Sequence, residues 1–250
     1  MTHPDPPASA RTPRRAVLLT VGGLAATGAG FAVGSDVAHA ADSGAAPDSL
    51  DVLRVPTPGE DLMTEHGLLV RILLIYRHLL AIRASEQPVP AGHVHDSALI
   101  IHDYIEAFHE ELEEAYVFRR LMQADQLKPT VSTLLLQHAR GRELTQLILT
   151  GSGGNGSLPT AAADQVASAM TAFVRMYEPH EAREDTVVYP AFRALLKPAE
   201  IADLGERFAD LQTEQFGRDG FAAMLGRVAA IEHGLGIYDL AQFTPPNITP

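Results

Sequence analysis

Two copies of one unit constrain how this chain can fold. Each copy is a single histidine followed, 42 or 43 residues later, by a His-x-x-x-Glu pair. The copies consist of His66, His109 and Glu113, and of His138, His180 and Glu184. Every one of these residues falls in a segment whose apolar side chains recur at helical spacing. Four imidazoles and two carboxylates supplied by four helices are the ligands that a dinuclear metal site in a four-helix bundle requires.

Four long segments have the apolar periodicity of helices. We expect these helices over residues 60–84, 96–126, 131–149 and 160–196. No segment alternates between apolar and polar residues for long enough to predict a strand. The sequence therefore predicts an all-α fold, and the short connections favour an antiparallel, up-down four-helix bundle.

Loop-forming residues set the expected ends of these helices. Residues 91–95 are expected to form a loop, so that Asp96 or Ser97 caps the second helix. Two prolines lie inside the fourth helical segment. The first of them, Pro179, predicts a kink next to His180, because proline cannot donate a helical hydrogen bond.

Residues 1–40 are similar to an export signal of the twin-arginine type. Arg14 and Arg15 precede a weakly hydrophobic stretch at 16–34, and a small-x-small cleavage site follows at 38–40. Cleavage there leaves no stable membrane insertion and places the mature protein outside the cytoplasmic membrane, in the cell envelope, periplasm or exterior. An uncleaved membrane anchor is the alternative, against which the five glycines of the stretch argue.

The rest of the chain divides into three parts by composition. A linker is expected at 41–58, the helical bundle at 59–197 and a C-terminal helical extension at 198–250. Within the extension we expect helices at 200–215 and 220–234. The apolar tail at 237–243 is expected to pack back on the bundle.

Charge and cysteine content exclude several classes of partner and cofactor. The chain has 19 Lys and Arg against 31 Asp and Glu. A surface this acidic repels nucleic acid and anionic membranes. Cysteine is absent from the sequence, which excludes disulfides, iron–sulfur clusters, thiolate zinc sites and cysteine-attached haem. Any transition metal must therefore be bound by nitrogen and oxygen ligands.

Helix geometry brings the paired residues to one point. His109 and Glu113 differ by about 40° around the helix axis and about 6 Å along it, so both side chains reach the same place. His180 and Glu184 have the same relation. Such a mixture of imidazole and carboxylate suits iron, with manganese also possible, and each glutamate can bridge two ions. Without metal, these six groups are costly to bury in an apolar bundle.

The alternative interpretation is that these residues are ordinary polar side chains. A single His-x-x-x-Glu on an exposed helix face is usually a solvated pair, and a single histidine such as His66 is more often a core or cap residue than a ligand. The recurrence of the unit, in matching order and spacing on four helices, favours the metal site.

Four motifs within residues 58–197 resemble those of the hemerythrin-like, or HHE cation-binding, family. They are Glu65-His66-Gly67, His109-Glu-Glu-Leu-Glu113, Gln137-His138 and His180-Glu-Ala-Arg-Glu184. The resemblance implies a four-helix bundle with two non-haem iron ions bridged by the two glutamates. In that family the centre binds or senses dioxygen, nitric oxide or iron, and some members decompose peroxide.

The chain departs from the oxygen-carrying hemerythrins at two positions. Those proteins have His-x-x-x-His on the third helix, whereas Arg142 stands four residues after His138 here. They also have His-x-x-x-x-Asp on the fourth helix, whereas this chain has His-x-x-x-Glu. The chain resembles the six-ligand branch of the family. Loss of one histidine leaves one iron more open, which favours redox turnover or sensing over reversible oxygen carriage.

Other polar residues are expected to have structural positions. Tyr116 is expected in the core, with hydrogen bonding to a metal-bound oxygen as the alternative. Glu110 is expected to be an exposed acid, with service as an extra ligand as the alternative. Arg142 either pairs with a ligand carboxylate or is solvated. The remaining histidines considered are expected near the bundle end, on the far face of the first helix, or in the first loop: His102, His78, His93 and His95.

Two functions fit the sequence. The first is an exported di-iron protein that binds or senses dioxygen or nitric oxide, or holds iron. The second is a di-iron enzyme that decomposes peroxide. A bundle that binds zinc, or no metal, is the third possibility. The sequence predicts no oligomeric state.

Overall fold

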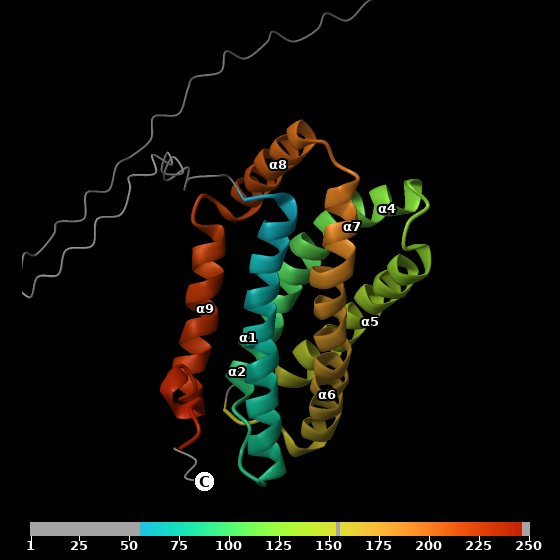
Figure 1. Cartoon of the computed structure of the whole chain (residues 1–250). Coiled ribbons are helices and arrows are strands. Elements are labelled where there is room, and N and C mark those ends of the chain that lie inside the picture. The colour runs from blue at the N-terminus through green and yellow to red at the C-terminus, as the bar shows by residue number, and fades with distance from the viewer. Residues whose placement is uncertain (1–55, 154–155, 247–250) are drawn as a thin grey trace, which may run out of the picture. The chain divides into compact units, whose positions relative to one another are not determined.

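The structure, a computed structural model, describes residues 56–153 and 156–246, and these residues are almost entirely helical (Figure 1). The export signal, the linker up to residue 55 and the last four residues lie outside the described residues. No β-strand occurs in the described part of the chain, where a single isolated bridge joins Pro90 to Ser157. The prediction of an all-α fold is confirmed.

The first half contains α1 (Pro58–Ala84), α2 (Ala91–Ile100), η1 (Ile101–His109), α3 (Glu110–Leu112), η2 (Glu113–Phe118), α4 (Arg119–Gln123) and α5 (Lys128–Ser152). The second half contains α6 (Thr160–Arg183), η3 (Glu184–Val188), α7 (Tyr189–Ala194), α8 (Pro198–Phe216), α9 (Gly220–Leu235) and η4 (Leu240–Phe243). The segments η1, η2 and η3 are π-helical, and η4 is a 3₁₀ turn. The run from α2 to α4 is continuous, as is the run from α6 to α7.

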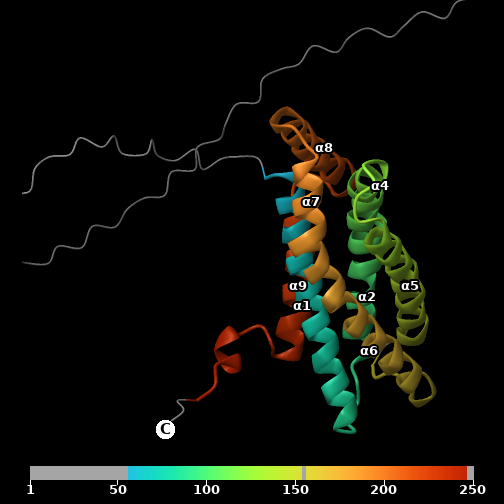
Figure 2. The ribbon, with the colours of Figure 1, turned by 45° about the vertical axis from the view of Figure 1, so that its right-hand side comes forward.

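The long helices pack side by side around an apolar interior. Helix α6 lies along both α1 and α5, and α2 lies along α5 (Figures 1 and 2). Helix α9 lies beside α1 and α2. The sequence predicts an apolar stripe on α1. Its members Leu62, Leu69, Ile72, Leu73, Tyr76 and Leu79 are buried and line the interior, and Leu80 is half-buried against them. Burial of this stripe stabilises the helix through the hydrophobic effect.

A capping box fixes the start of α1. The Thr57 side chain accepts a hydrogen bond from the Glu60 backbone N–H at 3.3 Å, and the Glu60 carboxylate accepts one from the Thr57 N–H at 2.7 Å. Pro58 occupies the first turn, where its missing N–H costs nothing. These contacts satisfy backbone groups that a helix otherwise leaves without partners.

The expected loop at 91–95 is wrong, because α2 begins at Ala91 directly after Pro90. The connection between α5 and α6 holds the start of α2, because the Ala91 N–H donates a hydrogen bond to the Gly156 carbonyl at 2.8 Å. Val94 is fully buried and belongs to the core. Burial of one face therefore overrides the weak helix propensity of this segment.

Proline does not interrupt α6 where the sequence analysis expected a kink. The helix continues through Pro179 to Arg183, and the departure from α-helical geometry comes later, in η3. Pro190 follows η3 in the first turn of α7. A π-helical turn changes the hydrogen-bonding register ahead of Pro190, which has no N–H to offer.

The C-terminal residues form two helices and an exposed tail. Helices α8 and α9 extend the two helices expected from the sequence by a few residues. Of the tail expected to pack back on the bundle, Ile237 packs against the core. The expectation is wrong for the residues after it, since Leu240 is 82% exposed and Phe243 is 62% exposed. The chain turns at Gly236 (φ +70°), and the Tyr238 ring then stacks on His233 with centroids 3.9 Å apart. None of the described helices combines the length and the apolar character needed to span a membrane.

Candidate metal centre

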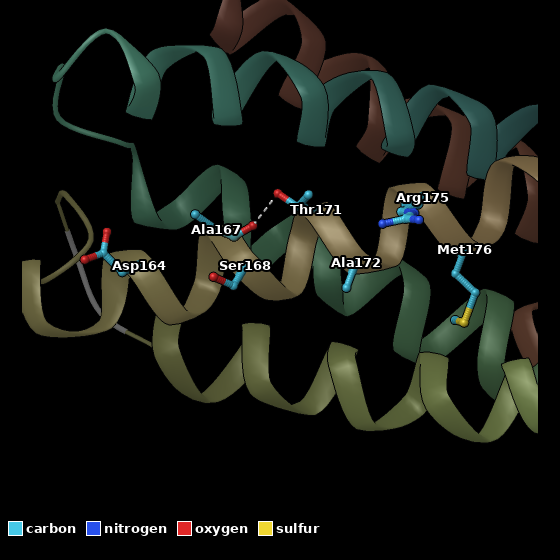
Figure 3. A pocket seen from close by; sticks show the side chains of 7 residues that line it. All are labelled: Asp164, Ala167, Ser168, Thr171, Ala172, Arg175 and Met176. Carbon is cyan, nitrogen blue, oxygen red and sulfur yellow. Dashed lines mark hydrogen bonds between the residues drawn. The ribbon is translucent and has the colours of Figure 1, made fainter.

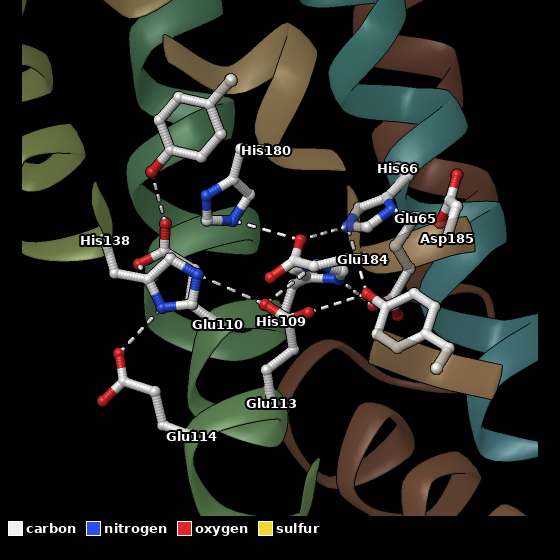
Figure 4. A network of polar contacts seen from close by, with 12 residues as sticks. Glu65, His66, His109, Glu110, Glu113, Glu114, His138, His180, Glu184 and Asp185 are labelled. Atoms are coloured by element: carbon white, nitrogen blue, oxygen red, sulfur yellow. Dashed lines mark hydrogen bonds and ion pairs between the residues drawn. The ribbon is translucent and has the colours of Figure 1, made fainter. Parts of the chain in front are cut away.

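The six residues singled out by the sequence repeat converge in the interior. They come from α1 (His66), η1 (His109), η2 (Glu113), α5 (His138), α6 (His180) and η3 (Glu184). Each is at most 3% exposed. Among the described residues, three sets of possible ligand atoms each lie within 4.8 Å of one another. Two of them consist of these six residues and share Glu113, and the third joins His138 to Glu110 and Glu114. The six side chains point toward one another (Figure 4), and these groups could hold a metal ion.

Each glutamate lies between histidines from two helices. The Glu113 Oε2 atom is 3.5 Å from His109 Nε2 and 3.4 Å from His138 Nε2. The Glu184 Oε2 atom is 3.1 Å from His180 Nε2 and 3.4 Å from His66 Nε2. The imidazoles form two neighbouring pairs: the rings of His66 and His109 are 4.8 Å apart, and those of His138 and His180 are 5.0 Å apart. Each carboxylate therefore spans both histidine pairs.

The second nitrogen of every imidazole has its own acceptor. The Nδ1 atoms are bonded as follows: His66 to Asp185 at 2.7 Å, His109 to Glu65 at 2.8 Å, His138 to Glu114 at 3.0 Å and His180 to Gln137 at 2.8 Å. Because these acceptor oxygens take the Nδ1–H, the Nε2 lone pair of each neutral imidazole points at the carboxylates. Such outer partners orient histidine ligands in metal sites and raise their basicity.

Several buried polar atoms in this pocket lack a hydrogen-bond partner among the described residues. They are Glu113 Oε2, both carboxylate oxygens of Glu184 and His138 Nε2. Buried polar atoms are rarely left without partners, because desolvation then goes uncompensated. A cation held by these carboxylates and Nε2 atoms would satisfy them.

Without a cation, protons on imidazoles balance the negative charge of the carboxylates in this pocket. Burial acts to lower the pKa of His138, but the nearby Glu113 carboxylate and the hydrogen bond to Glu114 outweigh it and raise that pKa to about 10. The hydrogen bond to Asp185 and the nearby Glu184 carboxylate similarly overcome burial and raise the pKa of His66. Burial acts to raise the pKa of Glu113, yet the surrounding histidines hold it well below its usual range. Metal binding must therefore displace protons from imidazoles.

A tyrosine that the sequence analysis missed lies at the edge of the pocket. The Tyr189 hydroxyl donates a 2.7 Å hydrogen bond to Glu113 Oε1 and lies 3.1 Å from His66 Nε2. Tyr116, the tyrosine considered instead, packs against Phe208. Tyr189 follows Glu184 by five residues, which is a different face in an α-helix but the same side in a π-helical turn. The spacing was visible in the sequence, whereas the π-helical turn was not.

Glu110 and Arg142 form a buried network beside the pocket. The expectation of an exposed Glu110 is wrong, because this residue is 1% exposed and accepts a 2.6 Å hydrogen bond from Tyr177. Burial raises the pKa of Glu110 to about 7. The Arg142 guanidinium lies 2.8 Å from carboxylate oxygens of both Glu110 and Glu114. Arg142 therefore pairs with carboxylates beside the six-residue cluster, and its guanidinium is no metal ligand.

The remaining histidines lie apart from the cluster. His102 is half-exposed and pairs with Asp103. His93 and His95 belong to α2 and are not in a loop, and His95 Nδ1 lies 3.3 Å from Ser152 Oγ. His78 lies on α1 outside the cluster.

A surface depression on α6 is separate from this centre. It is lined by residues of α6 alone: Asp164, Ala167, Ser168, Thr171, Ala172, Arg175 and Met176 (Figure 3). These side chains include no histidine and one carboxylate, so the depression lacks the ligand set of the buried cluster.

Relatives of known sequence occur in mycobacteria. Uncharacterized protein Rv1995 and uncharacterized protein MT2051 of Mycobacterium tuberculosis, and uncharacterized protein Mb2018 of Mycobacterium bovis, are each 46% identical to this chain over 200 residues. The match covers 80% of this chain and 78% of each relative. No family model and no solved structure matches the chain significantly. The chain, an all-helical protein with a buried His/Glu cluster that could bind metal, belongs to the same family as these mycobacterial proteins.

Proposed function

We propose that this protein is a hemerythrin-like protein that binds two iron ions in its buried His/Glu cluster. In this proposal α1, the α2–α4 run, α5 and the α6–α7 run form an antiparallel, up-down four-helix bundle. The neighbour relations of these helices support the arrangement, since α6 lies along α1 and α5, and α2 lies along α5. Each run supplies the ligands of one motif of the repeat.

One observation carries the proposal: each buried glutamate places one oxygen between Nε2 atoms from two different helices. The four N···O distances are 3.1–3.5 Å. This set of four imidazoles and two carboxylates suits iron, and manganese accepts the same ligands. When bound, a pair of iron ions supplies the redox chemistry needed to bind dioxygen, nitric oxide or peroxide.

Other side chains of this protein orient the ligands of the site and limit the access of solvent to it. The four Nδ1 acceptors fix the imidazole orientations, and the apolar core around the cluster excludes bulk water. Six protein ligands leave positions open on two ions that prefer six-fold coordination. A small ligand can occupy these positions. We therefore propose that the protein binds or senses dioxygen or nitric oxide, or holds iron.

A second candidate function is decomposition of peroxide. Arg142 favours it, because this residue stands where oxygen-carrying hemerythrins supply a further histidine, and its guanidinium is engaged by Glu110 and Glu114. The ion on that side is consequently short of one ligand. An open position favours turnover over stable adduct formation.

We also propose that the protein acts outside the cytoplasmic membrane. The twin-arginine motif and the small-x-small site of the N-terminal residues support export. Loading of the buried site before export suits a pathway that transports folded proteins.

Metal analysis of the purified full-length chain tests the proposal. We expect about two iron ions per chain from iron-replete cells. His109→Ala and His180→Ala should lower both metal content and the midpoint of urea unfolding, because binding is coupled to folding. Glu184→Gln, which preserves the shape of the side chain, serves in case the alanine variants fail to fold. His102→Ala is the matched control and should retain the wild-type metal content.

Ligand assays then separate the two functions. A stable nitric oxide or dioxygen adduct without turnover supports the binding function. Rapid evolution of oxygen from hydrogen peroxide, lost in the ligand variants, supports the enzyme. Wild-type protein that contains no iron and takes up none, or ligand variants with unchanged iron content, would refute the di-iron assignment.

A further inference from the structure

The sequence repeat extends beyond the ligands to two aromatic residues. Phe118 follows Glu113 by five positions, and Tyr189 follows Glu184 by five positions. Each is reached through a π-helical turn that begins at the glutamate. The Phe118 ring stacks on His138 with centroids 5.4 Å apart, and the Tyr189 ring stacks on His66 with centroids 5.5 Å apart. The two aromatic rings thus occupy equivalent positions, one beside each histidine pair.

The hydroxyl group of Tyr189 breaks this internal symmetry. It is 2.7 Å from Glu113 Oε1 and 3.1 Å from His66 Nε2, whereas Phe118 offers no polar atom to the other side. The carboxylates reflect the difference. One oxygen of Glu113 receives a hydrogen bond, while both oxygens of Glu184 lack a hydrogen-bond partner in the described part of the chain. On the side of His66 and His109 a buried hydroxyl therefore donates to a glutamate of the cluster. On the side of His138 and His180 the nearest buried hydroxyl, that of Tyr177, donates instead to Glu110.

We propose that Tyr189 is a positioning residue that directs small anionic ligands, such as azide or peroxide, to the cation on the His66 side. The inference rests on the proposed di-iron function. Once cations draw the Glu113 carboxylate to themselves, that carboxylate becomes a weaker acceptor. The hydroxyl can then rotate its proton toward an anion bound beside it. The apolar Phe118 ring gives an anion on the other side no such donor.

Azide is the probe of this inference, because its binding to oxidised di-iron protein is followed by visible absorbance without turnover. Tyr189→Phe should retain two iron ions and bind azide about tenfold more weakly, which corresponds to about 1.4 kcal/mol for one lost hydrogen bond. The double variant Tyr189→Phe/Phe118→Tyr moves the hydroxyl to the equivalent position and should recover most of the affinity. Tyr76→Phe removes another fully buried hydroxyl, one without a hydrogen-bond partner, and should leave azide binding unchanged.

The outcomes separate this inference from the proposed function. If wild-type protein binds no iron, the di-iron function fails and the inference fails with it. If all variants bind iron but Tyr189→Phe retains azide affinity within twofold of the wild type, the inference alone is overturned. It is also overturned if Tyr76→Phe weakens azide binding equally, or if Tyr189→Phe alone loses its iron, because the hydroxyl would then act in packing or in metal retention.

Discussion

Replacement of Gly141 by alanine is expected to destabilise the fold near the candidate metal centre. This residue lies in the middle of α5, where a Cβ atom would stand 2.0 Å from the Tyr177 hydroxyl oxygen and 2.9 Å from two carbons of its ring. Tyr177 is buried, stacks on Phe173 with centroids 4.2 Å apart, and donates its hydrogen bond to Glu110. The ring has little room to retreat, so Gly141→Ala should force it off that hydrogen bond.

The expected loss of stability follows from three contributions. Overpacking a well-filled interior costs about 1–3 kcal/mol. Loss of a hydrogen bond to a buried carboxyl group costs about 1.5–3 kcal/mol more. The higher helix propensity of alanine offsets about 0.5–1 kcal/mol. We therefore expect Gly141→Ala to lower the free energy of unfolding by about 2–5 kcal/mol.

Urea unfolding followed by circular dichroism, with a chelator present to remove metal, measures this effect. Gly67→Ala is the matched control, because it is exposed in α1 with no atom within 4 Å of the added Cβ, and it should stabilise by about 0.5–1 kcal/mol. Tyr177→Phe removes the nearest clashing atom, so it should reduce the cost of Gly141→Ala when the two are combined. The reasoning is refuted if Gly141→Ala is as stable as Gly67→Ala.

Three further predictions concern charge and capping. The pKa of His138, about 10 in the folded chain against about 6.5 unfolded, contributes stability that is present below pH 6.5 and lost as pH rises through about 10. With metal chelated, the urea midpoint should fall between pH 7 and pH 10, and His138→Gln should show a smaller fall. Burial, then repulsion from Glu65 and Glu60, raises the pKa of Asp61 from 3.8 to about 7, so stability is lost as pH rises from about 4 to about 7 and the loss is complete above pH 7. Asp61→Asn should raise the free energy of unfolding at pH 8 but give no gain at pH 4, by urea titration at both values. Thr57→Ala removes the cap of α1 and should lower the free energy of unfolding by about 1 kcal/mol, with iron content unchanged in metal analysis.

The six clustered residues could be predicted from the sequence because the argument depended on local helix geometry. A residue and its fourth neighbour share one face of an α-helix, and the observed distances within the pairs are 3.5 Å for His109 and Glu113 and 3.1 Å for His180 and Glu184. The recurrence of the unit then implied that the two single histidines join them. Neither step required knowledge of a distant contact.

Two residues that the sequence analysis misplaced near the cluster follow or adjoin π-helical turns. A π-helical turn adds a residue and changes which later side chains face the interior. Glu110, between η1 and η2, is buried although it was expected in solvent, and Tyr189, after η3, reaches the pocket although it was not considered. No propensity or periodicity in a single sequence signals such turns, which are stabilised by tertiary packing.

The hydrogen bonds of the Nδ1 atoms show that the sequence repeat also includes residues adjacent to the six candidate ligands. The acceptors Glu65 and Gln137 directly precede a single histidine, and Glu114 and Asp185 directly follow a bridging glutamate. Each acceptor therefore takes the Nδ1–H of a histidine on a neighbouring helix. Four of the inter-helix contacts of the pocket are thus set by residues adjacent to ligands, which explains how two similar halves build one closed site.

The two halves of the site differ in the charge of the groups that accept the Nδ1–H hydrogen bonds. His66 and His109 donate to the carboxylates of Asp185 and Glu65, whereas His180 donates to the neutral amide of Gln137. The remaining acceptor, Glu114, shares its charge with the Arg142 guanidinium. An imidazole whose Nδ1–H is accepted by a carboxylate is a stronger metal ligand than one whose Nδ1–H is accepted by an amide. The His66 side therefore combines the two carboxylate-bonded imidazoles with the Tyr189 hydroxyl, so we expect a cation to be held more tightly there and an anion to bind at the same end.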